Sequence, residues 1–180
     1  MYELTGYIVL VSHCLLNRYS AVYGTSRSPK TSISIISVLT DFDVGVIQLE
    51  CPEFTYLGPN RFWMVKDQYD NAYYRLHCRD IACSAVEQVK EYLRNGFKLI
   101  GVLCVKGSPS CGYYSVKRGD WKGNPLEAGT ATRSNEMGVF IEELNDCFKG
   151  EGIDARFFEY DPKNPAGEGD RLRRWVEEVI

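Results

Sequence analysis

The chain has 180 residues, of which 44% are hydrophobic and 25% are charged. This apolar content is too high for a disordered chain and the charge is too high for a membrane protein, so we expect one soluble globular domain spanning residues 1–180. With 21 Lys and Arg against 24 Asp and Glu, the formal net charge is −3. This balance argues against broad nucleic-acid binding, which needs a concentrated basic surface, and favours a small-molecule partner. Nothing in the sequence indicates an oligomeric state.

The chain contains seven cysteines, and an odd number disfavours a secreted disulfide framework. Residues 7–16 are apolar, but no basic segment precedes them and the run is too short to span a bilayer, so we expect no signal peptide and no membrane span. We therefore expect a cytoplasmic protein. In that reducing compartment, several cysteines indicate buried small hydrophobes, a catalytic thiolate or metal ligands.

Short apolar runs alternate with segments of helical period, which predicts βαβ units and a mainly parallel sheet. The expected strands are 7–12, 44–49, 99–105 and 155–160. The expected helices begin at Ser28-Pro29, near Asp80, near Ser134 and at Asp170, and the second ends at Asn95-Gly96. Right-handed crossovers then give a three-layer α/β sandwich, Rossmann- or flavodoxin-like, with a mainly parallel four-stranded sheet in the order 2-1-3-4.

Three cysteines, Cys14, Cys51 and Cys111, follow the ends of the first three predicted strands. The long connections 52–74 and 106–130 leave the carboxyl edge of the sheet, where open α/β sheets bind ligands. If the three strands are neighbours, their loops converge on a possible three-thiolate site. The absence of any C-x-x-C pair disfavours zinc ribbons and ferredoxin-type clusters. Three separated thiolates suit a cubane cluster with one open iron or, less well, a zinc ion with an open fourth position.

The other four cysteines are expected to be structural. Cys104 ends the third strand among apolar residues and is the first substitute ligand if one of the three is wrong. Cys78 and Cys83 flank the start of the second predicted helix, and Cys147 lies on the apolar stripe of the third. His13 precedes Cys14 and would face the opposite side of a strand, so we expect it to pack against or support the site.

Three motifs in order along the chain resemble the thiouracil desulfidase (TudS-like) family of small cytoplasmic iron–sulfur proteins: V-S-x-C-L-L, C-P-E and S-P-S-C-G. The resemblance covers nearly the whole chain, and its most specific piece is K-G-S-P-S-C-G at 106–112. It implies a 4Fe-4S cluster held by Cys14, Cys51 and Cys111, with the fourth iron free to bind the sulfur of a thiolated nucleobase. It also implies that Glu53 moves protons and that Ser108 orients or relays them.

The chemistry implied by the resemblance is not redox. The open iron acts as a Lewis acid on the thiocarbonyl sulfur, water adds at the carbon, and sulfide leaves onto the cluster. The chain departs from the family where residues 17–20 replace the usual glycine and the arginine-tyrosine-aspartate-glycine stretch after C-L-L, and where the paired glycines after C-P-E are missing. We therefore expect a divergent pocket, no tRNA-sized substrate, and a cluster that air can remove or zinc partly replace.

Aromatic and basic side chains in the two long loops are candidates for substrate contacts. Arg61, Lys66 and Lys106 are the nearby cations that could polarise a substrate oxygen or balance cluster charge. The planar side chains could stack a flat heterocycle, or they could instead pack the loops against the domain. They are Phe54, Tyr56, Phe62, Trp63, Tyr69, Tyr73, Tyr74, Tyr113 and Tyr114.

Other interpretations of the same residues remain open. Glu53 could be a solvated loop acid or a carboxylate that caps the following segment, and Ser108 could only shape a turn. The chain could also be a non-enzymatic iron–sulfur or zinc-binding module that works without either residue. A third alternative is a metal-free enzyme with Cys111 as nucleophile, although it needs a partner base, for which the candidates are the two histidines or nearby acids.

Overall fold

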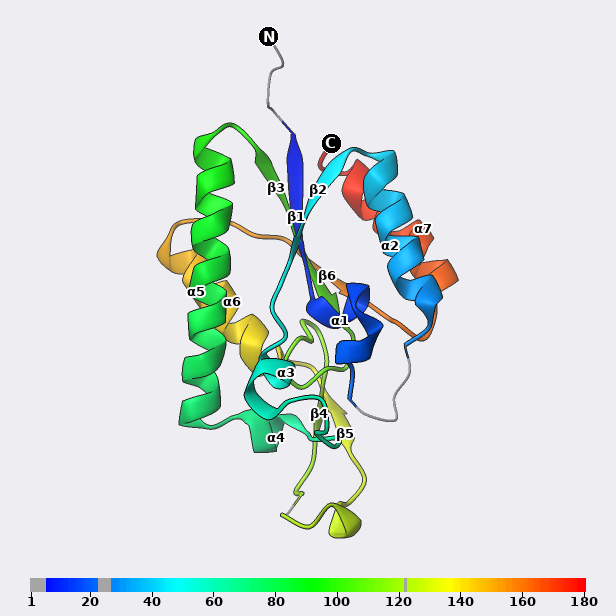
Figure 1. The fold of residues 1–180 in the computed structure, drawn as a ribbon, viewed down its shortest axis with the longest axis vertical. Coiled ribbons are helices and arrows are strands. Elements are labelled where there is room, and N and C mark those ends of the chain that lie inside the picture. The colour runs from blue at the N-terminus through cyan, green and yellow to red at the C-terminus, as the bar shows by residue number, and fades with distance from the viewer. Residues whose placement is uncertain (1–5, 23–26, 122) are drawn as a thin grey trace.

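A parallel four-stranded sheet forms the middle layer of the protein (Figure 1). The computed structural model describes residues 6–22, 27–121 and 123–180. The strand order is β2-β1-β3-β6, so the predicted α/β sandwich is confirmed, and β6 is the fourth strand of the predicted order. The strands are β1 (Tyr7–Val11), β2 (Val44–Gln48), β3 (Lys98–Val105) and β6 (Phe157–Tyr160).

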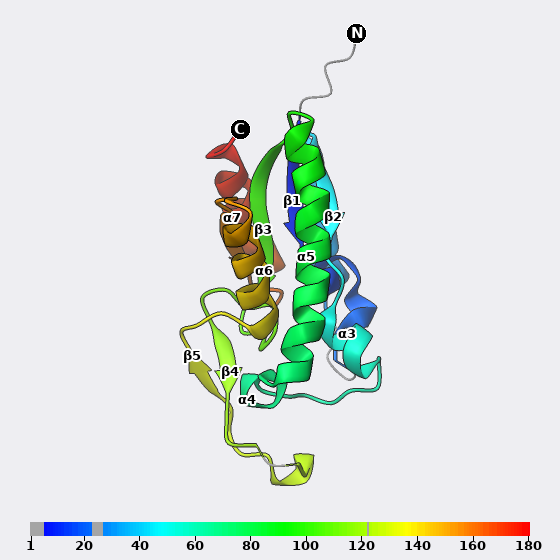
Figure 2. The ribbon, with the colours of Figure 1, turned by 90° about the vertical axis from the view of Figure 1, so that its left-hand side faces the viewer.

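Two pairs of helices cover the faces of the sheet, α2 with α7 on one face and α5 with α6 on the other (Figures 1 and 2). Helix α2 begins at the predicted place, because the Ser28 side chain accepts a hydrogen bond from the Lys30 amide (3.2 Å) and Pro29 occupies the first helical position. The helices are α2 (Pro29–Asp41), α5 (Ala72–Arg94), α6 (Val139–Gly150) and α7 (Pro165–Glu177).

The core lies on both faces of the two central strands. Residues 8–11 of β1 and 100–105 of β3 are all buried, as expected for parallel strands that are covered by helices on each side. This double burial leaves no room for a ligand within the sheet. A ligand site is therefore expected beyond the strand ends.

Three predicted helix starts differ from the structure. Helix α5 begins at Ala72, about two turns before Asp80, because the Asn71 side chain accepts a hydrogen bond from the Tyr74 amide (3.1 Å) and caps it there. Helix α6 begins at Val139 rather than near Ser134, and α7 begins at Pro165 rather than Asp170.

Short elements occupy the long connections and gather beyond the carboxyl end of the sheet (Figures 1 and 2). A two-stranded antiparallel hairpin of β4 and β5, which the helical pattern did not predict, projects from this end. Within the described ranges, no helix has the length and apolar character needed to cross a bilayer. The short elements are α1 (His13–Leu16), α3 (Pro52–Leu57), α4 (Lys66–Tyr69), β4 (Val116–Arg118), β5 (Thr132–Ser134) and 3-10 turns at Arg18–Ser20 and Pro125–Glu127.

Candidate functional site

A cavity of about 270 Å³ lies at the carboxyl end of the sheet, where the loops after β1, β2 and β3 meet. Its volume is close to the lower end of the range for small-molecule sites, about 300–1,000 Å³. The structure brings all five candidate site residues from the sequence to the wall of this one cavity. They are Cys14, Cys51, Glu53, Ser108 and Cys111.

Local hydrogen bonds hold each of the three cysteine loops in place. Ser12 Oγ donates to the Leu103 carbonyl of β3 (2.8 Å), which fixes the turn that carries Cys14. The Phe54 amide donates to Cys51 Sγ (3.4 Å), so this thiol caps the start of α3. The Cys111 carbonyl accepts a hydrogen bond from the Val105 amide (2.8 Å), which closes the loop back onto β3.

The Cys51 and Cys111 thiols are each 7% exposed, and Cys14 is half-buried. Burial, together with the nearby charges of Glu53 and Cys14, raises the pKa of Cys51 to about 12. Burial and the charges of Cys51 and Cys14 likewise raise the pKa of Cys111 well above its ordinary value. Both thiols therefore keep their protons at neutral pH unless a cation lies beside them, and bound metal supplies such a charge.

The same protonation weighs against Cys111 as a metal-free nucleophile, because the thiolate is the reactive form. Neither histidine supplies a partner base at the cavity wall, where the candidate bases are the acids Glu53 and Asp161. His13 Nδ1 lies 3.1 Å from the Leu49 carbonyl, and His77 Nε2 lies 2.7 Å from Thr55 Oγ1. Neither histidine lines the cavity. His13 begins α1 rather than ending a strand, and it connects the first two loops.

At the cavity, the buried Arg27 Nε lacks a partner within the described part of the chain, and the buried Tyr69 hydroxyl has only the nearby Glu53 carboxylate. Arg27 also donates from Nη2 to Cys14 Sγ (3.1 Å). Burial and the adjacent Glu53 charge raise the pKa of Tyr69, so its hydroxyl remains a proton donor. An unpaired buried donor is costly, and Arg27 Nε fits a ligand that brings acceptor atoms, such as the sulfides of a cluster or an anion.

The donor set at the cavity is compatible with an iron–sulfur cluster. It consists of three thiols from three loops, with hydrogen-bond donors directed at two of the sulfur atoms. In a cubane cluster each cysteine binds a different iron, so the thiols surround the cluster and need not converge on one point. Among residues 6–22, 27–121 and 123–180, no group of three or more His, Cys, Asp or Glu side chains is arranged to hold a metal ion.

Glu53 is 8% exposed and does not lie in solvent, so the interpretation as a solvated loop acid is wrong. Arg61 Nε donates to Glu53 Oε2 over 3.2 Å. The remaining guanidinium nitrogens donate to the carbonyls of Ser20 (2.7 Å) and Gly58 (3.2 Å). Arg61 therefore joins the first and second loops and fixes the orientation of the carboxylate at the cavity wall.

Ser108 shapes the turn in which it lies, which agrees with the alternative to a catalytic role. Its hydroxyl oxygen accepts hydrogen bonds from the amides of Cys111 (3.0 Å) and Ser110 (3.4 Å). Because both bonds use the oxygen as an acceptor, they leave the hydroxyl proton available. Ser108 lines the cavity and can donate that proton to a ligand there.

Basic side chains dominate the rest of the wall, six against the acids Glu53 and Asp161. Lys106 pairs with Asp161 (3.1 Å). Lys117 Nζ lies 3.3 Å from the centre of the Trp63 ring. Its pKa is lowered by burial and by the charges of Lys163 and Arg133, which shows that these cations crowd one another. The basic residues are Arg27, Arg61, Lys106, Lys117, Arg133 and Lys163.

This surplus of cations suits an anionic ligand. Sequence reasoning found Arg61 and Lys106 but missed Arg27, Lys117, Arg133 and Lys163. The first comes from the segment before α2, the next two from the β4–β5 hairpin, and the last from the loop after β6. No local motif links these segments.

Lys66 was expected near the site and instead lies in a buried network beside it, with 2% of its side chain exposed. Its Nζ donates to Glu136 Oε2 (2.8 Å), the Met137 carbonyl (2.7 Å) and Glu142 Oε1 (2.5 Å). Arg118 of the hairpin also pairs with Glu136 (2.8 Å). The network therefore ties α4 and the β4–β5 hairpin to the start of α6.

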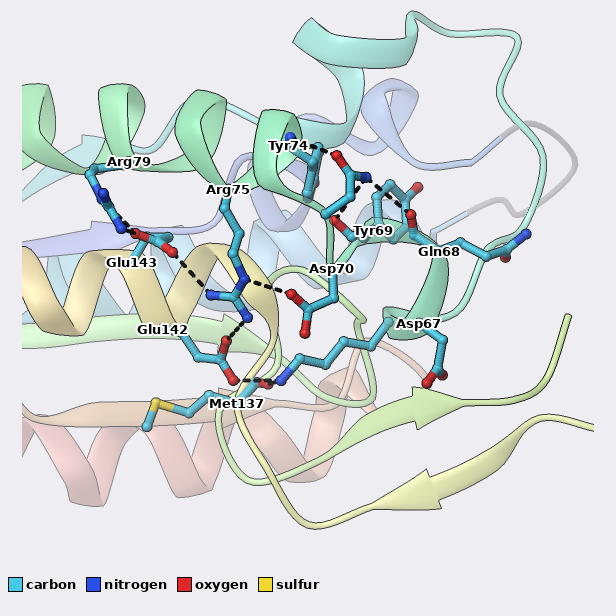
Figure 3. A network of polar contacts seen from close by, with 12 residues as sticks. Asp67, Gln68, Tyr69, Asp70, Tyr74, Arg75, Arg79, Met137, Glu142 and Glu143 are labelled. Carbon is cyan, nitrogen blue, oxygen red and sulfur yellow. Dashed lines mark hydrogen bonds and ion pairs between the residues drawn. The ribbon is translucent and has the colours of Figure 1, made fainter.

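Arg75 extends the same network along α5, where it contacts Asp70 (2.6 Å), Glu142 (2.7 Å) and Glu143 (3.0 Å) (Figure 3). The extended network fixes the hairpin that carries Lys117 and Arg133 against the main domain.

Of the nine candidate aromatic residues, Trp63 and Tyr69 line the cavity. The others do not, and several pack the loops as the alternative proposed. Tyr74 is fully buried, and its hydroxyl lies 2.9 Å from Ser110 Oγ. Tyr113 stacks on Phe157 with ring centroids 4.4 Å apart. Cys104 is a fully buried core residue that does not line the cavity.

A buried carboxylate that sequence reasoning missed, Glu159 of β6, holds the loop after Cys111. Its Oε1 accepts hydrogen bonds from the amides of Tyr113 (3.1 Å), Tyr114 (3.0 Å) and Ser115 (3.0 Å). Glu159 is 7% exposed, and these amides compensate the cost of burying its charge. The sequence signal for this role was an acidic residue within an otherwise apolar predicted strand.

Comparison with curated proteins finds the uncharacterized protein MJ0003 of Methanocaldococcus jannaschii, which is 33% identical over 104 residues. The matched segment is 58% of this chain and 66% of that protein, so the chain covers just under two thirds of the relative's length. No family model and no solved structure matches the chain.

Proposed function

We propose that the chain is an iron–sulfur-dependent desulfidase that hydrolyses the C=S group of a small thiolated compound, such as a thiopyrimidine, and releases sulfide. The supporting observation is the common cavity of Cys14, Cys51 and Cys111, with the buried Glu53 in its wall. The TudS-like motifs supply the expected reaction, and the three cysteines are the proposed ligands of a 4Fe-4S cluster. The many free thiols suit a reducing cytoplasm.

In the proposed hydrolysis, a bound cluster, Glu53 and Ser108 would each have a separate role. When bound, a cluster with an open iron would supply a Lewis acid for the substrate sulfur. Glu53, held by Arg61, accepts a proton from the water that adds to the thiocarbonyl carbon and returns a proton to the departing sulfide. Ser108 donates its free hydroxyl proton to a ring atom of the substrate. The net reaction converts C=S and water to C=O and hydrogen sulfide.

The cations of the wall favour a substrate with an anionic group. Burial and the charges of Lys163 and Arg133 lower the pKa of Lys117, and none of these three cations forms a salt bridge with another described residue. A phosphate would offset this positive charge, and Lys117, one of the cations that could contact it, lies over the Trp63 ring. We therefore favour a thiopyrimidine that carries an anionic group, such as a nucleoside monophosphate, over the free base.

The first test is anaerobic reconstitution of the full chain with iron and sulfide. We expect the visible absorption of a cluster, about four irons per chain, and release of sulfide and of the oxo-pyrimidine from a thiopyrimidine monophosphate. Cys14→Ser, Cys51→Ser and Cys111→Ser should each lose the cluster. The matched control is Cys83→Ser, which changes an exposed cysteine outside the cavity and should retain it.

The outcomes separate the alternatives. A cluster without sulfide release from any thiopyrimidine would favour the non-enzymatic module. Failure to bind iron under these conditions would overturn the proposal. Tight zinc binding that depends on the same three cysteines would instead support the alternative in which these cysteines hold a zinc ion.

A further inference from the structure

A second pair of thiols lies outside the cavity, on the surface formed by α5 and α6. Cys83 of α5 is exposed and Cys147 of α6 is half-buried. Their Sγ atoms are 2.8 Å apart, although the residues are 64 positions apart in the chain. A disulfide bond is about 2.05 Å long, so bond formation requires less than an ångström of approach. Neither cysteine lines the cavity.

Ion pairs between the helices fix this register on both sides of the thiols. One turn before them, Arg79 donates to Glu143 (2.8 Å), as Figure 3 shows. On the other side, Lys90 pairs with Glu151 (2.7 Å). Because Arg79 precedes Cys83 by four residues and Glu143 precedes Cys147 by four, the thiols and the first ion pair occupy matching faces of the two helices.

We propose that Cys83 and Cys147 form a redox modification site that reacts with low-molecular-weight disulfides and closes to a reversible interhelical disulfide. From the sequence, both cysteines were expected to be structural. Cys83 is exposed, so it does not serve as a buried packing residue. The short distance between the two sulfur atoms instead allows the pair to form a disulfide.

The reaction proceeds by two exchange steps. Cys83, the accessible thiol, attacks as its thiolate one sulfur of the small disulfide, forms a mixed disulfide and expels one thiolate. Cys147 then attacks the Cys83 sulfur, forms the protein disulfide and expels the second thiolate. The two protons of the cysteines pass to the two small thiols. The pair is oxidised by two electrons, and the small disulfide is reduced by two.

The surroundings of Cys147 suit its place as the second thiol. Burial raises its pKa to about 12, and the adjacent Cys83 thiol and its charge add to this increase, while Arg79 opposes it. Once Cys83 is capped in a mixed disulfide, its proton and charge are gone and only burial and Glu143 still oppose ionisation. Capping thus removes two of the effects that raise the pKa of Cys147, while burial, the largest of them, remains.

The bond would close a loop that contains Ser108, Cys111 and the whole β4–β5 hairpin. Such a cross-link stabilises a fold mainly by restricting the unfolded chain, and the effect grows with loop length. Because α5 and α6 are already in register, little change is expected at the cavity. Oxidation should therefore raise thermal stability and leave turnover by the holoprotein nearly unchanged.

The test uses the full chain with oxidised glutathione as the probe, followed by blocking of free thiols with N-ethylmaleimide and a non-reducing tryptic digest. Trypsin releases Cys83 in peptide 80–90 and Cys147 in peptide 134–149, and each peptide has one cysteine. We expect these two peptides to appear cross-linked, the thermal midpoint to rise by several degrees, and dithiothreitol to reverse both changes.

Single variants test the order of the steps. Cys147→Ser should accumulate glutathione on Cys83, whereas Cys83→Ser should leave Cys147 largely unmodified. Both variants should form the cluster as the unmodified chain does, which separates this site from the cavity. The proposal is overturned if both peptides carry N-ethylmaleimide after oxidation, if the glutathione adduct on Cys83 persists in the unmodified chain, or if either cysteine cross-links to a different partner.

Discussion

Arg61 Nε donates a hydrogen bond to Glu53 Oε2 at the cavity wall, and the two side chains are only 3% and 11% exposed. A buried pair of this kind gains little net stability, because desolvation offsets much of its attraction. Its value lies in fixing the position of the carboxylate. Arg61 also holds the carbonyl of Ser20, so the orientation of Glu53 depends on the loop that follows Cys14.

The first prediction concerns the charge of Glu53. Glu53→Gln keeps the size of the side chain and an acceptor for Arg61 but removes the proton acceptor, so turnover should fall by about 10²–10⁴-fold. Iron content should not change. Glu50→Gln, which alters an exposed acid three residues earlier, is the matched control and should keep full activity. An active Glu53→Gln protein with a full cluster would remove Glu53 from catalysis.

The second prediction concerns stability. Arg61→Met leaves the Glu53 charge buried without its partner and should lower the free energy of unfolding by about 3–5 kcal/mol, measured in urea. The double variant with Glu53→Gln should recover part of this loss, because no unpaired charge then remains. Equal stability of the single and double variants would show that the pair has no electrostatic coupling.

The third prediction concerns the anionic substrate. Arg133→Gln removes one of the cations that crowd Lys117 and should raise the KM for a thiopyrimidine monophosphate by about tenfold, equivalent to about 1.4 kcal/mol. Turnover of the free thiopyrimidine should be unaffected, since it carries no phosphate. Lys149→Gln, an exposed lysine at the end of α6, is the control. Equal changes for both substrates would contradict a phosphate contact at Arg133.

Much of the fold follows from local sequence patterns. The apolar runs predicted all four parallel strands to within about two residues, because a strand buried on both faces must be apolar throughout. The start of α5 was misplaced because its cap, Asn71, lies inside an aromatic-rich segment that reads as a loop. The β4–β5 hairpin was missed since its strands are three residues long and mostly polar.

The candidate site was only partly accessible from sequence. The cysteines were found because each follows a strand, and parallel strands end at one edge. The surrounding cations Lys117, Arg133 and Lys163 were not predicted, because they reach the cavity through tertiary contacts of the hairpin and of the loop after β6. Lys66 was misassigned for the converse reason: its position in sequence is near the site, but its ammonium group turns away to Glu136 and Glu142.

The fourth prediction concerns acid stability. Hydrogen bonds from Arg118 and Lys66 hold the pKa of Glu136 well below its ordinary value of 4.5. A carboxyl with a depressed folded-state pKa stabilises the fold fully above its unfolded pKa and loses that contribution as the pH falls below it. Glu136→Gln should therefore be less stable at neutral pH and lose less stability on acidification below 4.5.

Urea midpoints across this pH range measure the effect. Glu177→Gln, which changes an exposed acid at the end of α7, should keep the pH dependence of the unmodified chain. An unchanged slope in Glu136→Gln would mean that the Lys66 network does not contribute to acid sensitivity.

The fifth prediction concerns the glycine next to the third proposed ligand. A Cβ atom on Gly112 would approach the carbonyl oxygens of Ser115 and Ser108 more closely than real Cβ atoms do, and both are backbone atoms. The Gly112 amide also donates to the Ser108 carbonyl (3.0 Å), and its carbonyl accepts from Gly138 (2.8 Å). Gly112→Ala must therefore displace the loop that carries Cys111.

We expect Gly112→Ala to lower the free energy of unfolding by at least about 2 kcal/mol and to reduce the iron bound on reconstitution. Gly150→Ala is the matched control, because a Cβ there meets nothing within 4 Å, and as the last residue of α6 it should be neutral or slightly stabilising. If Gly112→Ala loses stability but binds iron fully, the loop can shift without moving Cys111. The close approach at Gly112 would then serve folding alone.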